Sequence, residues 1–323
     1  MVDSTLPQRA AADLEIHRPQ LTAYCYRMLA SPFDADDAVQ ETIVRAWRNL
    51  DRFEGRAALR SWLYRIATNV CLDMLKGAQR RARPMDLGPA REPVEANLSS
   101  PREPRWVEPI PDSLIEEDPA DIAVGRESVR LALIAALQNL PARQRAALLL
   151  HDVLHWEASE VAELLETSVA AINSALQRGR TTLAKRKLSS VDRLPPLSAA
   201  DHALLERYVA AFERYDLQAL TSLIREDATQ SMPPYDLWLR GRDDIFTWWL
   251  GPGIGCRGSR VLPAGRANGC PAFGQYKPSP GGGYEPWALQ VLEIAAGRVV
   301  ELTFFLDTAR LFPLFGLPGR LDS

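Results

Sequence analysis

The chain has 323 residues, of which 46% are hydrophobic and 24% charged, and its formal net charge is −3. This length predicts two or three domains that each bury a core. No apolar run could cross a bilayer and the first residues lack the hydrophobic stretch of a secretory signal, so we expect a cytoplasmic protein without membrane insertion. The four cysteines are far apart, with no CxxC pair and no histidine at zinc spacing, so we expect reduced thiols and neither a metal nor a cofactor.

Two helices are predicted before residue 50. Apolar residues repeat at helical spacing from Leu14 to Ala30. Ser31-Pro32 should end that helix, because proline disfavours helical backbone in the residue before it. Asp34, Asp36 and Asp37 should open a second helix, where negative charge suits the helix dipole. The polar face of this second helix suits a protein partner as well as water.

Asp51 to Arg83 is the stretch around which the chain is organised. Phe53 lies in a charged, Gly-containing turn, and a helix is predicted after it, with a buried stripe made of Leu63, Ile66, Ala67, Val70, Cys71 and Met74. The opposite face carries Arg65, Asn69, Asp73, Lys76 and Arg80. Arg56 to Arg83 holds seven Arg/Lys against one Asp. Basic residues interleaved with aromatic ones suit a nucleic-acid strand whose bases leave the stack. An ordinary solvated helix with a basic end explains these residues equally well.

Pro84 to Gly125 is rich in Pro, Glu and Asp and lacks sustained periodicity, so it is predicted to be a linker. If extended, it could span on the order of 100 Å. Trp106 is isolated in this acidic segment. We therefore expect its indole to dock onto a neighbouring domain.

A second helical domain is predicted from Glu127 onward. Its last two helices are joined by a short turn in which Ser168 is the expected N-cap. Ile172, Leu176 and Leu183 should face inward, and Ser168 to Lys187 contains five Arg/Lys and no acidic residue. A basic second helix after a tight turn is typical of a helix-turn-helix, although any tight helical pair can imitate that pattern. The expected outward residues are Asn173, Ser174, Gln177, Arg178 and Thr181.

The remainder of the chain predicts one α+β domain. An amphipathic helix is expected from Ala199 to Arg225, followed by β-like runs at Ala228–Met232, Trp287–Ala295 and Arg298–Asp307. Gly251 to Gly283 is expected to be loop, and its three consecutive glycines are not expected to bind phosphate, because no strand precedes them and no helix follows. A curved sheet with helices on one side fits this order.

The first two domains resemble the extracytoplasmic-function (ECF) group of bacterial RNA polymerase sigma factors. The matching segments are DADDAVQETIVRAWRNL, FEGRAALRSWLYRIATNVCLDMLK and LPARQRAALLLHDVLHWEASEVAELLETSVAAINSALQRGR. The resemblance covers about residues 13–188. It implies two all-α domains, a region 2 bundle and a region 4 helix-turn-helix, which direct transcription initiation by binding core RNA polymerase and promoter DNA.

The resemblance also implies roles for residues. The second helix would dock on the clamp helices of the largest polymerase subunit, and region 4 would bind the flap of the second subunit. The implied polymerase-binding residues are Asp37, Gln40, Glu41, Arg45 and Trp47. The implied −10 residues are Phe53, Arg56, Arg60, Trp62, Arg65, Asn69, Asp73, Lys76 and Arg80. The implied −35 residues are Ser168, Asn173, Ser174, Gln177, Arg178 and Thr181. Asn173 departs from the family, where this position is often basic.

The tail resembles the SnoaL-like extension of some of these sigma factors, a cone-shaped fold related to nuclear transport factor 2 (NTF2). Trp106 and Pro109 resemble the linker motif that accompanies such tails. The implied organisation is region 2 at 1–84, a linker at 85–126, region 4 at 127–190 and the tail at 197–323. By this resemblance the tail modulates activity, with an anti-sigma factor or a small ligand as its candidate partner.

Two other functions remain open at this point. The tail could be a cyclase or isomerase, but such sites use a His or Asp acid/base pair and the tail has only His202, with Asp236, Asp243, Glu285 and Asp307 as further polar groups. We therefore expect no enzyme activity, and a candidate ligand pocket lined by Trp238, Trp248, Trp249 and Phe304. A helix-turn-helix regulator fused to a ligand-binding tail is the other alternative. It leaves Asp34 to Arg83 unexplained.

Overall fold

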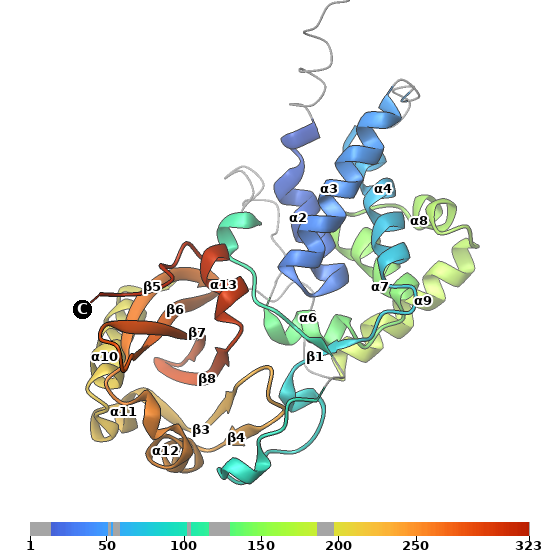
Figure 1. Ribbon diagram of the computed structural model, residues 1–323. Helices are drawn as coiled ribbons and strands as arrows, with labels where there is room; N and C mark the ends of the chain where they lie inside the picture. The colour runs from blue at the N-terminus through green and yellow to red at the C-terminus, as the bar shows by residue number, and fades with distance from the viewer. Residues whose placement is uncertain are drawn as a thin grey trace, which may run out of the picture. The chain divides into compact units, whose positions relative to one another are not determined.

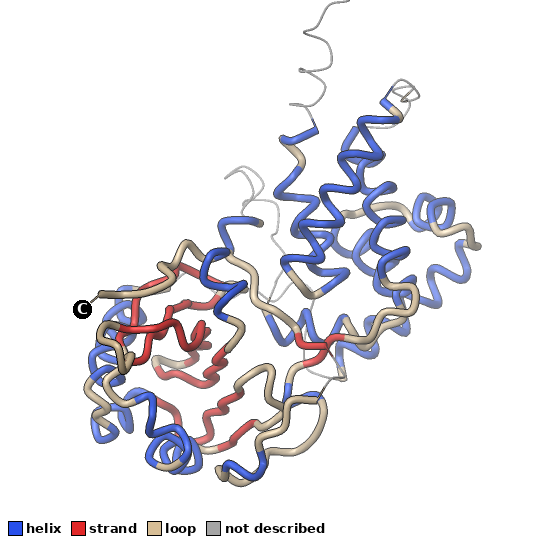
Figure 2. Tube along the Cα trace, viewed as in Figure 1, coloured by secondary structure: helices blue, strands red, loops and turns tan. Residues whose placement is uncertain are grey.

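A computed structural model of the chain describes residues 14–50, 53, 59–101, 105–115, 130–185 and 197–322. The chain divides into two compact units, each built from two separate stretches (Figure 1). One unit combines Met1–Arg81 with Val107–Arg193, and the other combines Ala82–Trp106 with Leu194–Ser323. The first is helical, and the second holds a sheet (Figure 2).

The helices predicted from apolar periodicity are present in the helical unit. They are α2 (Arg18–Leu29), α3 (Pro32–Arg48), α4 (Leu59–Met74), α6 (Leu131–Leu137), α7 (Ala142–Leu148), α8 (Ala158–Leu164) and α9 (Val169–Ala184). Two further short helices, η4 (Asp112–Leu114) and η5 (Leu149–Val153), were not predicted as separate elements. Among the helices of the described ranges, none has the length and hydropathy that a bilayer span requires.

Side-chain caps fix where two of these helices begin. The Ser31 hydroxyl accepts a hydrogen bond from the Asp34 backbone N–H at 3.3 Å, and Pro32 occupies the first turn of α3, where its missing N–H is tolerated. The Ser168 hydroxyl caps α9 in the same way, accepting from Ala171 N–H at 3.2 Å. The predicted cap at Ser168 is therefore confirmed.

The helix α4 ends earlier than the sequence predicts. Its last helical residue is Met74, and Gly77 has a φ of +73°, which ordinary side chains rarely adopt. Lys76 and Arg80 thus lie beyond the end of α4, and the expectation that they share its polar face was wrong. Both residues are exposed to solvent.

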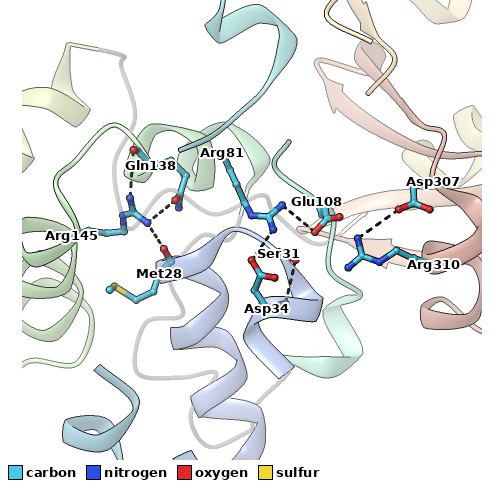
Figure 3. Close-up of polar contacts among 9 residues, drawn as sticks. All are labelled: Met28, Ser31, Asp34, Arg81, Glu108, Gln138, Arg145, Asp307 and Arg310. Atoms are coloured by element: carbon cyan, nitrogen blue, oxygen red, sulfur yellow. Dashed lines mark hydrogen bonds and ion pairs between the residues drawn. The ribbon is translucent and has the colours of Figure 1, made fainter. Parts of the chain in front are cut away.

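Arg81 does not extend the basic face either, because it is buried in the helical unit (Figure 3). Its guanidinium lies 2.7 Å from Asp34 Oδ2 and 3.3 Å from Glu108 Oε2. The backbone N–H of Glu108 in turn donates to Ala30 O at 3.1 Å. These bonds attach residues 107–111, an extended segment, to the start of α3, with Ile110 fully buried.

A second buried arginine joins α2 to the helices of the C-terminal half of this unit. Arg145, on α7, donates to Gln138 Oε1 at 2.6 Å and to Met28 O (Figure 3). It also donates to Leu137 O at 2.9 Å. Burial lowers the pKa of this guanidinium to about 10, which leaves it charged at neutral pH. Its hydrogen bonds to carbonyl oxygens compensate for the loss of water.

The second unit is an α+β domain built on one six-stranded sheet. The strands are β3 (Ile224–Ser231), β4 (Trp238–Arg240), β5 (Arg260–Ala267), β6 (Cys270–Pro278), β7 (Tyr284–Ala295) and β8 (Arg298–Phe305), in the order β4-β3-β8-β7-β6-β5. Only the β3–β8 pair of this sheet is parallel. The accompanying helices are α10 (Ala199–Glu213), α11 (Leu217–Leu223), α12 (Arg242–Leu250), η6 (Pro252–Cys256) and α13 (Thr308–Leu314).

Three expectations about this unit need correction. The helix expected over Ala199–Arg225 is broken into α10 and α11 at Tyr215, whose φ is +58°. Much of the expected loop over Gly251–Gly283 is β5 and β6, where glycine and proline interrupt the strand pattern without preventing pairing. Finally, helices pack on both faces of the sheet, because α13 places Phe312 against Tyr276 at 5.1 Å between ring centroids, on the face opposite Phe273 and the main core.

Residues 82–106 belong to this unit and not to a free linker. The short strands β1 (Arg81–Ala82) and β2 (Arg105–Trp106) pair with each other, and the turns η2 (Pro84–Asp86) and η3 (Glu95–Asn97) lie between them in the sequence. The indole Nε1–H of Trp238 donates to Gly88 O at 2.9 Å. Arg91 pairs with Asp236 at 2.5 Å, and Leu98 packs against the tail core. About half of the segment between the two helical domains is thus held against the tail.

Candidate functional sites

The clearest candidate DNA-reading element is α9, the second helix of the helix-turn-helix. Ile172, Leu176 and Leu183 are buried, which confirms the predicted inward face. Gly179 lies on the same face, and a Cβ at that position would come within 2.8 Å of Leu148 Cδ1. The glycine therefore allows α9 to pack closely on α7.

All the residues predicted to face outward from α9 are exposed, and so is the capping residue Ser168. The outward residues are Asn173, Ser174, Gln177, Arg178 and Thr181. Ser168 serves as the cap, and the Thr181 hydroxyl donates to Gln177 O at 2.8 Å, so these two hydroxyls are engaged with α9 itself. Asn173, Gln177 and Arg178 make no side-chain hydrogen bond or ion pair with any described residue.

Two arginines on α9 differ in their partners. Arg180 pairs with Asp152, which raises the pKa of the arginine. Arg178 makes no ion pair within the described ranges and projects from the exposed face. A free guanidinium can bind a base edge or a phosphate, whereas the paired one must first leave its carboxylate.

The candidate −10 surface lies on α4 and the residue that precedes it in the described chain, Phe53. The Phe53 and Trp62 rings are 5.1 Å apart, with an interplanar angle of 35°. Both are half-buried, Arg60 and Asn69 are exposed, and the Arg60 guanidinium lies 5.7 Å from the Tyr64 ring centroid. Arg56 lies outside the described residues. Aromatic rings and a cation are thus gathered at the N-terminal end of α4.

Arg65, predicted to face DNA, is instead engaged within the helical unit. It donates to Glu163 Oε1 at 2.9 Å, and its guanidinium carbon lies 5.8 Å from the Trp156 ring centroid. This hydrogen bond lowers the pKa of the Glu163 carboxyl, which is fully exposed. Nothing in the local sequence around Arg65 indicates a partner 98 residues away.

The candidate polymerase-binding and DNA-binding residues meet in one chain of ion pairs. Arg45 lies 2.6 Å from Glu41 on α3 and 3.7 Å from Asp73 on α4, and Asp73 pairs with Lys76 at 2.7 Å. The bond from Lys76 is the main cause of the lowered pKa of Asp73. The other predicted α3 residues, Asp37, Gln40 and Trp47, are exposed, with Trp47 at 55%. A large exposed tryptophan beside charged residues is typical of a protein interface.

The linker motif at Trp106–Pro111 is divided between the two units. Trp106 is half-buried in β2, whereas Pro109 and Ile110 are buried in the helical unit. The Tyr26 hydroxyl donates to Glu108 O at 2.7 Å, which adds to the attachment of this segment. In the sequence, the attachment of this segment is indicated by apolar residues that alternate with prolines. From that pattern we had expected only the Trp106 indole to dock.

The tail contains a cavity of about 340 Å³, part of it open to solvent. Trp248, Trp249 and Phe304 are among its lining residues, but Trp238 is not, and the Trp238 indole donates to Gly88 O. Phe212, Tyr215 and Trp287 supply further aromatic walls, and Gln230 and Gln275 supply amides. These residues were missed because they come from α10, the helix break and three strands, which only the fold brings together.

The tail offers little support for a catalytic centre. His202 is exposed and its Nδ1 contacts Ser198 O at 2.9 Å, so it is not part of the cavity. Asp236 pairs with Arg91, and Asp307 lies 3.7 Å from Arg310. No charged residue lines the cavity. Within the described ranges, no cluster of His, Cys, Asp and Glu is suited to hold a metal ion.

Comparison with known proteins gives consistent matches. Residues 14–81 match the family described as Sigma-70 region 2, and residues 130–183 match Sigma-70, region 4. The ECF RNA polymerase sigma factor SigG of Mycobacterium tuberculosis is 46% identical over 317 residues, covering 96% of this chain and 84% of that protein. The ECF RNA polymerase sigma factor SigJ of the same species is 30% identical over 248 residues, covering 74% and 72%. The crystal structure of M. tuberculosis SigJ matches with a TM-score of 0.60 at 23% identity, over 95% of this chain and 99% of that one.

Proposed function

This chain belongs to the ECF family of RNA polymerase sigma factors, and on that premise we propose which residues read the promoter and how the tail modulates initiation. As a sigma factor it directs transcription initiation, binding core RNA polymerase and promoter DNA, and it is not an enzyme. The residue assignments that follow are proposals.

Region 4 reads the −35 element through the exposed face of α9. The observation that carries this proposal is Arg178 beside Gln177 and Asn173 on that face: Arg178 makes no ion pair with a described residue, whereas Arg180 is held by Asp152. Amide and guanidinium groups recognise base edges in the major groove. Ser174 and Thr181, which are also exposed, are proposed to add phosphate or base contacts, while Ser168 keeps its role as the cap.

Region 2 captures −10 bases near Phe53 and Trp62. Stacking on an aromatic ring stabilises an extruded base, and Arg60 would neutralise nearby phosphates. Asn69, Lys76 and Arg80, all exposed, are secondary candidates, as is Arg56, which lies outside the described residues. Asp73 is already bound by Lys76 and Arg45, so its proposed role is to position them.

The exposed side of α3 binds the clamp helices of the largest polymerase subunit. Trp47 is the proposed anchor, because aromatic residues in the centre of interfaces contribute most of their binding energy. Asp37, Gln40, Glu41 and Arg45 form the polar surround. By the same proposal, region 4 contacts the flap of the second subunit.

The tail modulates initiation by controlling the connector between the two promoter-reading regions. The support is that residues 82–106 pack on the tail through Gly88, Arg91 and Leu98, while Val107 to Ile110 pack with the helices. Residues held on the tail cannot contribute to the reach of an extended linker. Releasing about 25 residues would add roughly 80 Å of contour.

Transcription in vitro tests the proposal. Purified core polymerase should initiate at a selected promoter only when the chain is added. A truncation after Leu188 and the substitution Trp106→Ala should both change the amount of transcript while leaving core binding intact. If both variants transcribe like the full chain, the tail does not modulate initiation. If the full chain supports no promoter-specific initiation, the residue assignments have no basis.

A further inference from the structure

We propose that Val169, the first residue of α9, is a specificity residue that contacts the 5-methyl group of a thymine in the −35 element. The inference rests on the proposed reading of that element by α9, and it names a chemical group that the helix selects there. Val169 is 44% exposed, although α9 buries Ile172 and Leu176 on its inner side. Packing of the helix therefore does not account for an apolar side chain at this position.

Val169 begins a row of exposed side chains along α9. Residues four apart lie one above the other on a helix, so Val169, Asn173 and Gln177 share a row, and all three are exposed. The row is about 12 Å long at a rise of about 1.5 Å per residue, which matches about three to four base pairs. Asn173 and Gln177 carry amides, which suit adenine edges. Val169 is the apolar end of this row.

The first part of α9 carries no charge. Residues 169–177 (VAAINSALQ) contain no acidic or basic side chain, and the acid that precedes them, Glu166, is exposed. The first basic residue on the helix is Arg178. Binding to the phosphate backbone depends mainly on cations. A segment that has none, with an acid before it, is therefore better suited to base edges than to the DNA backbone.

The place of Val169 on the helix favours contact with the floor of the major groove. In a helix-turn-helix, the N-terminal residues of the second helix contact base edges. The 5-methyl group of thymine is the apolar group presented there, and apolar side chains recognise it by direct contact. The valine side chain offers methyl groups and has no donor or acceptor that the groove would leave unpaired.

Exposure of an apolar residue is not unusual by itself. Isolated apolar side chains are common on protein surfaces, and Ile254, in η6 of the tail, is also 44% exposed. Ile254 therefore serves as the control for the loss of an exposed β-branched side chain. A protein partner such as core polymerase is the other surface that Val169 could contact. That contact would not respond when a methyl group is removed from the DNA.

Removal of single methyl groups from the promoter tests the proposal. A −35 element is first selected from a randomised duplex library with holoenzyme that contains the full chain. Each thymine of the element, on either strand, is then replaced by deoxyuridine, which lacks only the 5-methyl group. Competition binding should reveal a position at which holoenzyme binds about fourfold more weakly, the effect of burying one methyl group. A selected element without a preferred A·T pair, or no response at any thymine, would overturn the proposal.

The variant Val169→Ala connects the lost methyl group with this side chain. Alanine is a strong helix former, so the variant should fold, which thermal unfolding checks. Its holoenzyme should bind the thymine and deoxyuridine elements with equal affinity, whereas Ile254→Ala should keep the fourfold difference. A difference that persists in Val169→Ala would assign the methyl contact to another residue. Weaker core binding with the difference unchanged would assign the valine to a protein interface, and either result overturns the proposal.

Arg178→Ala on the same duplexes separates this inference from the proposed function. The substitution removes a different contact of the same face, so it tests whether that face reads the −35 element at all. If Arg178→Ala weakens −35 binding while the methyl effect persists in Val169→Ala, the face is right and the valine contact is wrong. If neither substitution changes discrimination among −35 sequences, the face itself is wrong and both proposals fail.

Discussion

Arg65 and Glu163 face each other across the helical unit, with Nη1 of the arginine 2.9 Å from Oε1 of the glutamate. The arginine lies on the helix that we propose for −10 binding, and the glutamate on the first helix of the helix-turn-helix. In this arrangement the Arg65 guanidinium is bound by a carboxylate of the same chain. The Glu163 side chain is 70% exposed and that of Arg65 is 31% exposed, so solvent screens the pair and its release costs little folding stability.

Glu163→Gln should therefore favour promoter binding. Removing the carboxylate frees Arg65, and we expect holoenzyme affinity for promoter DNA to rise by about two- to fivefold at low salt. Glu166→Gln is the matched control, since Glu166 is an exposed acid after the same helix with no ion pair among the described residues. Fluorescence anisotropy with labelled promoter measures both. An equal gain in the two variants would mean a general charge effect and no specific release of Arg65.

Phe53→Ala should impair promoter opening more than initial binding. Stacking of an extruded base on an aromatic ring is worth about 1–3 kcal/mol, and the loss of Phe53 also leaves Trp62 without its partner ring. Permanganate reactivity of promoter thymines measures opening, and complex formation at low temperature serves as the internal control. Unchanged permanganate reactivity would assign Phe53 a packing role only.

Arg178→Ala and Arg180→Ala form a matched pair on α9. Loss of a base contact by Arg178 should reduce −35 affinity by about 1–3 kcal/mol and relax preference at one base position. Arg180, held by Asp152, should matter less. Mobility-shift titrations over all single substitutions of the −35 element distinguish the two. If Arg180→Ala reduces −35 affinity more than Arg178→Ala does, a different face of α9 contacts the DNA than the one proposed.

Arg81→Met should destabilise the helical unit by about 1–3 kcal/mol, because two partly buried carboxylates would lose their positively charged partner. Asp34 and Glu108 side chains are only 30% and 17% exposed. The triple variant that adds Asp34→Asn and Glu108→Gln should recover part of the loss. Urea unfolding midpoints of the three proteins test this. A triple variant less stable than Arg81→Met alone would show that each carboxylate has favourable contacts of its own.

Arg91→Ala should alter transcription if the tail controls the connector. The substitution removes the ion pair with Asp236 while leaving the Trp238–Gly88 bond, so we expect a partial effect in the direction of the tail truncation. Arg225→Ala is the control, because Arg225 pairs with Asp227 on an exposed part of the same domain. Identical transcript levels for the two variants would argue against a role of this contact.

Helical periodicity predicted most of the helical unit because the information is local. The inward residues of α9 repeat within one helix, and its cap is a single serine, so Ile172, Leu176 and Ser168 could be assigned from neighbours in the sequence. The end of α4 was not predicted. A pattern of basic residues continues to Arg83, but Gly77 and the buried pairing of Arg81 with Asp34 end the helix.

The tail was harder to predict because its information is not local. β5 and β6 contain Pro263, Gly265 and Gly274, which indicate loop when read alone, and their pairing with β7 is what makes them strands. The same limit applies to the cavity. Tryptophans could be nominated by type, but the Trp238 indole donates to Gly88 O, while Gln230 and Trp287 enter the site through strand register.

The close approach at Gly179 has a consequence for how promoter preference can evolve. The inner side of α9 is constrained at Gly179, where a methyl group would come too close to Leu148. On the outer side, Asn173, Gln177 and Arg178 make no side-chain hydrogen bond or ion pair with a described residue. Substitutions on the outer side therefore change little in folding stability, which is the usual outcome at exposed positions. If α9 reads the −35 element as we propose, a duplicated copy of this gene could acquire a new regulon by replacing a few outer residues, with no compensating change in the scaffold beneath them.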